Sequence, residues 1–164
     1  MKSVRKIIIC LLIAIGIFFL MDCLSPDETN PYQTKESKEL NTLMDSDDFL
    51  NLDVTQTSME MEKIATDMYY QINSSDETKQ PTIERYNKMK QGLKDDYSKL
   101  NSLIKEWQNL PEAQNELIEY QKIVKNILDS NLTYDNFGDT YEYLMYAQDF
   151  LSNLYPSLSQ LYNK

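Results

Sequence analysis

The sequence is 164 residues long and strongly acidic, with 16 basic residues, 26 acidic residues and a formal net charge of −10. This charge does not favour nucleic acid, because contacts to phosphates require a basic face. The chain has no histidine and three glycines, which excludes histidine-dependent catalytic triads, histidine-ligated metal sites and glycine-rich phosphate loops. We therefore expect no enzymatic activity, no cofactor and no metal site.

The first 23 residues have the pattern of a bacterial export signal. An apolar run of 15 residues, 7–21, follows three basic residues, Lys2, Arg5 and Lys6. Such cations stay on the cytoplasmic side while the apolar run enters the bilayer. As a helix the run reaches about 22 Å, less than the roughly 30 Å of a bilayer's hydrocarbon core. We expect the chain after Cys23 to lie on the extracytoplasmic face of the cell membrane.

The end of the apolar run resembles a bacterial lipoprotein signal. In Leu20-Met21-Asp22-Cys23 a leucine stands three places before the cysteine, whereas Met21 and Asp22 occupy places where that signal has small residues. With the polar, acidic remainder, the chain resembles the small acidic helical lipoproteins of Gram-positive-type bacteria. The resemblance implies lipidation of Cys23 and no particular activity. Two other outcomes stay open: an uncleaved N-terminal helix, and cleavage elsewhere with release of the protein.

Residues 24–38 have the composition of a flexible tether, with Pro26, Pro31 and few apolar side chains. Residues 39–164 are expected to form one domain. Because no cysteine follows residue 23, this domain has no disulfide and depends on packing. From residue 24 onward the chain has 13 basic and 25 acidic residues, a net charge of −12, which suits a cationic partner.

Apolar residues recur every three or four positions along the domain, the spacing of amphipathic helices. Pro81 and Pro111 suit first helical turns, Asp139 or Thr140 can cap the last helix, and Pro156 is expected to break or kink it. The predicted helices cover approximately residues 48–73, 81–109, 111–128 and 139–155.

This pattern contains no strand-like alternation and predicts an all-α fold. The natural packing of such helices is an antiparallel bundle of three to four helices. The alternative architecture is an extended coiled-coil hairpin.

Tyrosine is unusually frequent, with 12 in the chain. Its ring offers apolar area and a hydrogen-bonding tip, so tyrosine is enriched in binding surfaces, although the same residues can also form the core and rim of a bundle. The candidate partner-binding residues are Tyr134, Tyr141, Tyr143, Tyr146, Tyr155 and Trp107.

Together these features predict a membrane-anchored extracytoplasmic helical module that binds or masks an envelope protein or a cationic peptide. An immunity or exclusion lipoprotein is one concrete form of this function. The alternative is a cell-wall polymer or small-ligand binding protein, with an aromatic pocket between helices near Trp107.

Overall fold

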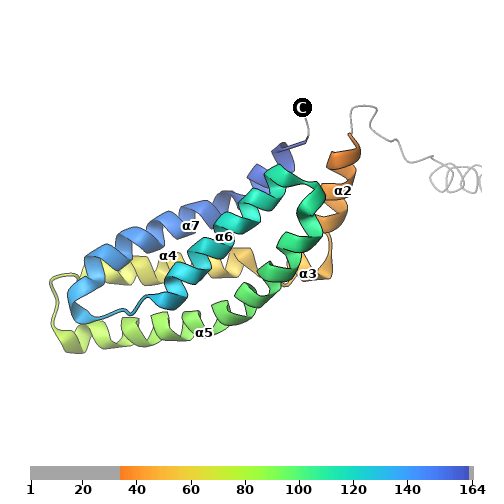
Figure 1. The fold of residues 1–164 in the computed structure, drawn as a ribbon. Coiled ribbons are helices and arrows are strands. Elements are labelled where there is room, and N and C mark those ends of the chain that lie inside the picture. The colour runs from red at the N-terminus through yellow and green to blue at the C-terminus, as the bar shows by residue number, and fades with distance from the viewer. Residues whose placement is uncertain (1–33, 163–164) are drawn as a thin grey trace, which may run out of the picture. The chain divides into compact units, whose positions relative to one another are not determined.

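The computed structural model describes residues 34–162, in which every regular element is a helix. Short helices α2 (Lys35–Met44) and α3 (Asp47–Leu50) precede an antiparallel bundle (Figure 1). The bundle consists of α4 (Val54–Gln71), α5 (Asp76–Glu106), α6 (Pro111–Asp129) and α7 (Phe137–Gln160), with 3₁₀ turns η1 (Trp107–Asn109) and η2 (Tyr134–Asn136) between helices. The predicted all-α bundle is confirmed. The predicted signal and Cys23 lie outside the described residues.

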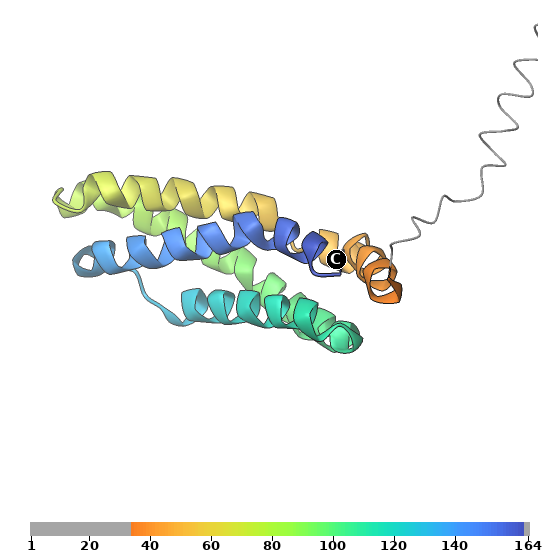
Figure 2. The same ribbon diagram turned by 90° about the horizontal axis from the view of Figure 1, so that it is seen from above.

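Helices α4 and α7 make the most extensive contact in the bundle and lie side by side in both views (Figures 1 and 2). The Ser58 hydroxyl of α4 shares a 2.9 Å hydrogen bond with the Ser152 hydroxyl of α7. Ala65 of α4 and Ala147 of α7 are fully buried. Small side chains let two helix axes approach closely, so α4 is held against α7.

The apolar stripes predicted for the second, third and fourth helices form the core. The fully or almost fully buried members include Leu93 and Leu100 of α5, Leu117 and Ile127 of α6, and Leu144, Leu151 and Leu154 of α7. Burying one such side chain contributes about 1.5–3 kcal/mol. Within residues 34–162, no helix is both long and apolar enough to cross a membrane.

The predicted helix 48–73 is interrupted, which corrects the prediction of one continuous helix. Asp53 adopts φ 46° and ψ 44°, a left-handed conformation that ends one helical segment before Val54 starts the next. As a result Phe49 and Leu52 are buried, whereas Leu50 between them is exposed. The apolar periodicity does not continue across Asp53, because the break there changes which residues share one face of the helix.

Helix α5 begins at Asp76, five residues before the predicted start, so Pro81 lies inside it. Asp76 and Glu77 occupy the first turn, where negative side chains are favoured by the helix dipole. Contacts to other segments hold both sides of Pro81: Lys79 donates to the Tyr134 carbonyl at 3.1 Å, and Thr82 donates to Gln71 at 2.8 Å. These contacts offset the backbone hydrogen bond that the proline lacks.

The boundaries predicted for the tether and for the last helix also shift, whereas the helix start predicted at Pro111 is confirmed. Helix α2 begins at Lys35, inside the predicted tether, because the Thr34 side chain caps it by accepting from the Ser37 amide at 3.0 Å. Helix α7 begins at Phe137 rather than at residue 139 or 140, with the Phe137 ring buried. It then continues through Pro156 to Gln160, where buried Leu154 and Leu158 anchor the turns on either side of the proline.

Gly92 offers a direct test of the packing around α5. It lies at an exposed position inside the helix, and a Cβ placed there meets no atom within 4 Å. We expect Gly92→Ala to raise the free energy of unfolding by about 1 kcal/mol, the helix-propensity difference, measured by urea denaturation followed by circular dichroism. Gly138→Ala, in the first turn of α7 and equally unobstructed, is the control and should gain less. A lower free energy of unfolding in Gly92→Ala would contradict the conclusion that a Cβ at position 92 meets no other atom.

Candidate functional site

The structure places Trp107 in the core rather than on a contact surface. Its side chain is fully buried, and its ring centroid lies 5.1 Å from that of Phe49. The Phe49 ring in turn lies 5.2 Å from the half-buried ring of Tyr155. Trp107 continues the apolar stripe of α5 into η1, which explains its burial. It cannot contact a partner directly in this fold.

Tyr134 fastens the connector between α6 and α7 to the start of α5. Its hydroxyl donates to Gln80 at 2.6 Å, and its carbonyl accepts from the buried Lys79 ammonium at 3.1 Å. The Lys79 ammonium also lies 5.3 Å from the centroid of the Phe137 ring, a favourable cation–π distance. The ring of Tyr134 is partly exposed, but its hydroxyl and carbonyl groups are used in hydrogen bonds within the bundle.

Tyr143 and Tyr146 lie on the side of α7 that faces α6, with ring centroids 6.1 Å apart. The Tyr143 hydroxyl is buried, and burial raises its pKa. Tyr146 is exposed, and its hydroxyl donates to Glu119 of α6 at 3.3 Å. This pair therefore combines a packing residue with one solvent-facing ring.

Tyr141 belongs to a different cluster, in which two tyrosines of α4 take part. The Tyr69 ring lies 5.6 Å from the Tyr141 ring and 5.4 Å from the Tyr70 ring. Tyr69 is 58% exposed and Tyr70 is 77% exposed. We call Tyr69, Tyr70 and Tyr141 the tyrosine surface. Sequence reasoning missed the two α4 residues, although adjacent tyrosines beside an apolar stripe are a signal of exposed aromatic area.

A cleft of about 460 Å³ separates the first half of α4 from the middle of α5. Its inner wall includes Leu52, Met89 and Leu93, and its rim is formed by charged and amide side chains from both helices. None of the described residues that line it is aromatic. It therefore differs from the aromatic pocket that the sequence suggested beside Trp107.

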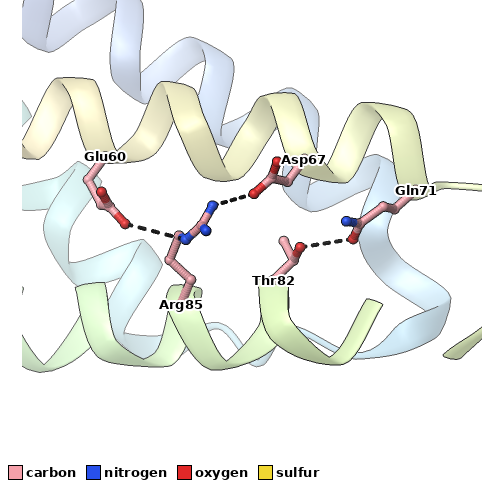
Figure 3. Close-up of polar contacts among 5 residues, drawn as sticks. All are labelled: Glu60, Asp67, Gln71, Thr82 and Arg85. Carbon is pink, nitrogen blue, oxygen red and sulfur yellow. Dashed lines mark hydrogen bonds and ion pairs between the residues drawn. The ribbon is translucent and has the colours of Figure 1, made fainter. Parts of the chain in front are cut away.

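Charged side chains close the cleft at both ends. Figure 3 shows Arg85 of α5 reaching between Glu60 and Asp67 of α4, with 3.9 Å between its Nε and Glu60 Oε1 and a direct ion pair to Asp67. At the other end, the Lys99 ammonium donates to the Asn51 carbonyl at 2.7 Å. Residues 85 and 99 of α5 are about 21 Å apart along the helix, which sets the length of the cleft.

Asp96 lies in the wall of this cleft, and its residue is only 8% exposed. Burial raises the pKa of its carboxyl to about 6, against the opposing effect of Lys99, whose ammonium is 3.5 Å from Asp96 Oδ1. The negative charges of Asp53 and Asp95 raise this pKa further. Asp96 falls between Leu93 and Leu100 on the apolar stripe of α5, and a carboxyl at such a position is a sequence signal of burial.

Behind Asp96 lies the hydroxyl of Tyr120, from α6. The Tyr120 side chain is fully buried and its hydroxyl makes no hydrogen bond of ordinary geometry. Burial and the nearby Asp96 charge raise its pKa, while a side-chain hydrogen bond with Thr57 lowers it. Thr57 and Asp96 line the cleft, whereas Tyr120 does not.

Comparison with known proteins adds no relative. The chain matches no protein-family model, and no curated protein or solved structure is significantly similar to it.

The raised pKa of Asp96 predicts a specific pH dependence of stability. A carboxyl whose pKa is higher in the folded state than in the unfolded state stabilises the fold while it is protonated. This contribution is fully present below the pKa of the unfolded state, near 4, and is lost as the pH rises through the pKa of the folded state, about 6. The asparagine of Asp96→Asn carries no charge at either pH. We therefore expect the free energy of unfolding of Asp96→Asn minus that of wild type to rise by about 2 kcal/mol between pH 4.5 and pH 7.5.

Urea denaturation at the two pH values measures this difference. Asp95→Asn, at the exposed neighbouring position, is the matched control and should show much less change with pH. An equal change in both variants would show that Asp96 is not the group responsible.

Proposed function

We propose that this protein is a membrane-anchored extracytoplasmic helical module that binds or masks an envelope protein, and that the tyrosine surface is its contact site. The observation that carries the proposal is the exposure of Tyr69 and Tyr70 beside Tyr141. Tyrosine rings supply large contact area with little loss of side-chain entropy, and they are enriched among the residues that dominate binding energy.

The chemistry of the partner follows from the charge of the chain. With 25 acidic and 13 basic residues after Cys23, the domain attracts a partner whose contact face is basic. Anchoring to the membrane keeps the module close to envelope proteins. An immunity or exclusion lipoprotein, which blocks an incoming toxin, phage or conjugation machine at the membrane, is the form of this function that the acidic charge favours.

Site-specific crosslinking in the native host tests the contact site. With a photoreactive phenylalanine at position 70, and separately at position 141, we expect the full-length protein to capture the same envelope protein. Asn115, exposed on α6, is the control position and should capture none. Tyr69→Ala, combined with the crosslinker at position 70, should lower the yield about tenfold, as expected for loss of a central contact tyrosine.

Different captured proteins at positions 70 and 141, or equal yields at positions 70 and 115, would overturn the tyrosine surface as the contact site. Because Tyr69 and Tyr70 are exposed, their substitution should leave the bundle folded. Circular dichroism of each variant checks that point.

The anchor has a separate test. If Cys23 is lipidated, metabolic labelling with a fatty-acid probe should mark the wild-type protein and leave Cys23→Ser unlabelled. Absence of label in both proteins would contradict lipidation and favour the uncleaved N-terminal helix.

A further inference from the structure

We infer that the tyrosine surface recognises arginine side chains of a protein partner, with the ring of Tyr70 as the platform on which a guanidinium group stacks. Asp139 and Glu142, beside Tyr141 on α7, pair with the same arginines. The inference rests on the proposed function for the place of the contact, and it adds which side chains of the partner are bound there.

The tyrosine surface lies at the end of the bundle that holds two connectors. Loop 72–75 joins α4 to α5, and residues 130–136 join α6 to α7; both lie at the left in Figures 1 and 2. We call this the connector end. The described chain begins at the opposite end, where the Thr34 hydroxyl donates to the Tyr162 carbonyl at 3.5 Å. The connector end is therefore the end of the domain that is remote from its first described residue.

Unpaired negative charge is concentrated at the connector end. Residues 69–78 and 131–142 contain five acidic and no basic residues. These five side chains are exposed and form no ion pair within residues 34–162: Asp76, Glu77, Asp135, Asp139 and Glu142. The nearby Lys79 is buried, and its ammonium donates to the Tyr134 carbonyl. A group that binds here must therefore bring its own positive charge.

Acids elsewhere on the bundle are paired to a greater extent. Asp67 forms an ion pair with Arg85 (Figure 3), and Glu119 forms one with Lys122. Such pairs reduce the attraction that these parts of the surface exert on a basic partner. The exposed aromatic rings and the unpaired carboxylates thus coincide at one end of the bundle.

The exposed rings determine which cation fits best. Tyr70 is 77% exposed, and its ring is tilted by 76° from that of Tyr69 at a centroid distance of 5.4 Å. Cations bind favourably over the faces of aromatic rings. A guanidinium group is planar and weakly hydrated, so it stacks on a ring more readily than an ammonium group, while its N–H groups remain available to carboxylates. This combination favours arginine over lysine.

The surroundings of Tyr141 supply the rest of such a site. Asp139 and Glu142 are exposed and stand within two residues of Tyr141. Ile72 and Met145, each about one helical turn beyond a tyrosine of the surface, are both 37% exposed. Their apolar area suits the methylene groups of an arginine side chain.

Other occupants fit this surface less well. Membrane surfaces and nucleic acids are anionic, so the unpaired carboxylates repel them. A second copy of the chain, bound through the same surface, would bring like charges together. A neutral sugar stacks on tyrosine rings but makes no use of the charge, and the experiment below separates it from an arginine ligand.

Surface plasmon resonance with the full-length protein in nonionic detergent micelles tests the inference. The probe is an immobilised peptide, acetyl-Arg-Ala-Arg-Ala-Arg-Gly on a neutral linker, at low salt and pH 7.5. We expect saturable binding that is at least about threefold tighter than binding to the same peptide with lysine in place of arginine. A peptide with glutamine in place of arginine should not bind.

Two substitutions at position 70 test the stacking. Tyr70→Ala should weaken binding of the arginine peptide about tenfold and remove the preference over lysine. Tyr70→Phe, which keeps the ring and loses only the hydroxyl, should bind within about twofold of wild type. Circular dichroism checks that both variants are folded.

A matched pair of double variants tests the carboxylates. Asp139→Asn with Glu142→Gln should weaken binding about fivefold. Glu106→Gln with Glu112→Gln, far from the connector end, is the control and should change binding less than about twofold. Each double variant removes two exposed charges, one of them in the first turn of a helix, so the net charge of the two proteins is the same.

Four results would overturn the inference: no binding of the arginine peptide, equal affinity for arginine and lysine peptides, equal weakening by the two double variants, or Tyr70→Phe as weak as Tyr70→Ala. Binding of a neutral soluble wall glycan that is lost in Tyr70→Ala and unchanged in the Asp139 and Glu142 double variant would overturn it as well, in favour of a sugar ligand.

Failure of this inference is distinguishable from failure of the proposed function. If position 70 captures one envelope protein while the peptides show no arginine preference, the contact site stands and arginine recognition is wrong. If the arginine peptide binds as expected while positions 70 and 141 capture different proteins, the arginine chemistry stands and the proposed envelope partner is wrong.

Discussion

The close packing of α4 on α7 is the constraint on which the rest of the bundle depends. Buried Ala65 and Ala147 leave no bulky side chain to separate the two helices. A helix held against one neighbour has less contact with the other, and α4 meets α5 in part through polar contacts such as the hydrogen bond from Thr82 to Gln71. Arg85 spans that gap to Glu60 and Asp67 (Figure 3). The cleft between α4 and α5 is thus a consequence of the α4–α7 contact.

The same contact creates the tyrosine surface. Tyr69 stands near the end of α4 and Tyr141 near the start of α7, so the two are far apart in sequence. Antiparallel packing brings their rings to 5.6 Å. Tyr69 and Tyr70 are neighbours on α4, and only the folded bundle adds Tyr141 of α7 to them.

Sequence periodicity predicts those parts of the fold in which one helix determines its own buried face. Leu93, Leu117 and Leu151 lie on stripes that could be recognised without knowledge of their neighbours, and all three are buried. The break at Asp53 could not be predicted in this way, because aspartate is compatible with a helix and its left-handed conformation accompanies the burial of Phe49 and Leu52, which depends on the rest of the fold. The cleft was also beyond sequence reasoning, since Asp53 and Asp96 belong to different segments. Asp96 itself was detectable, as a carboxyl on an apolar stripe.

The cleft stays open because closing it would gain little and cost much. Leu52 and Leu93, its apolar wall, are already 0% and 2% exposed, so closure would remove almost no further apolar area from water. It would instead bring the Asp53, Asp95 and Asp96 carboxyl groups together and strip them of water, at several kcal/mol for each ion that remains charged. Protonation of Asp96 relieves only one of these charges.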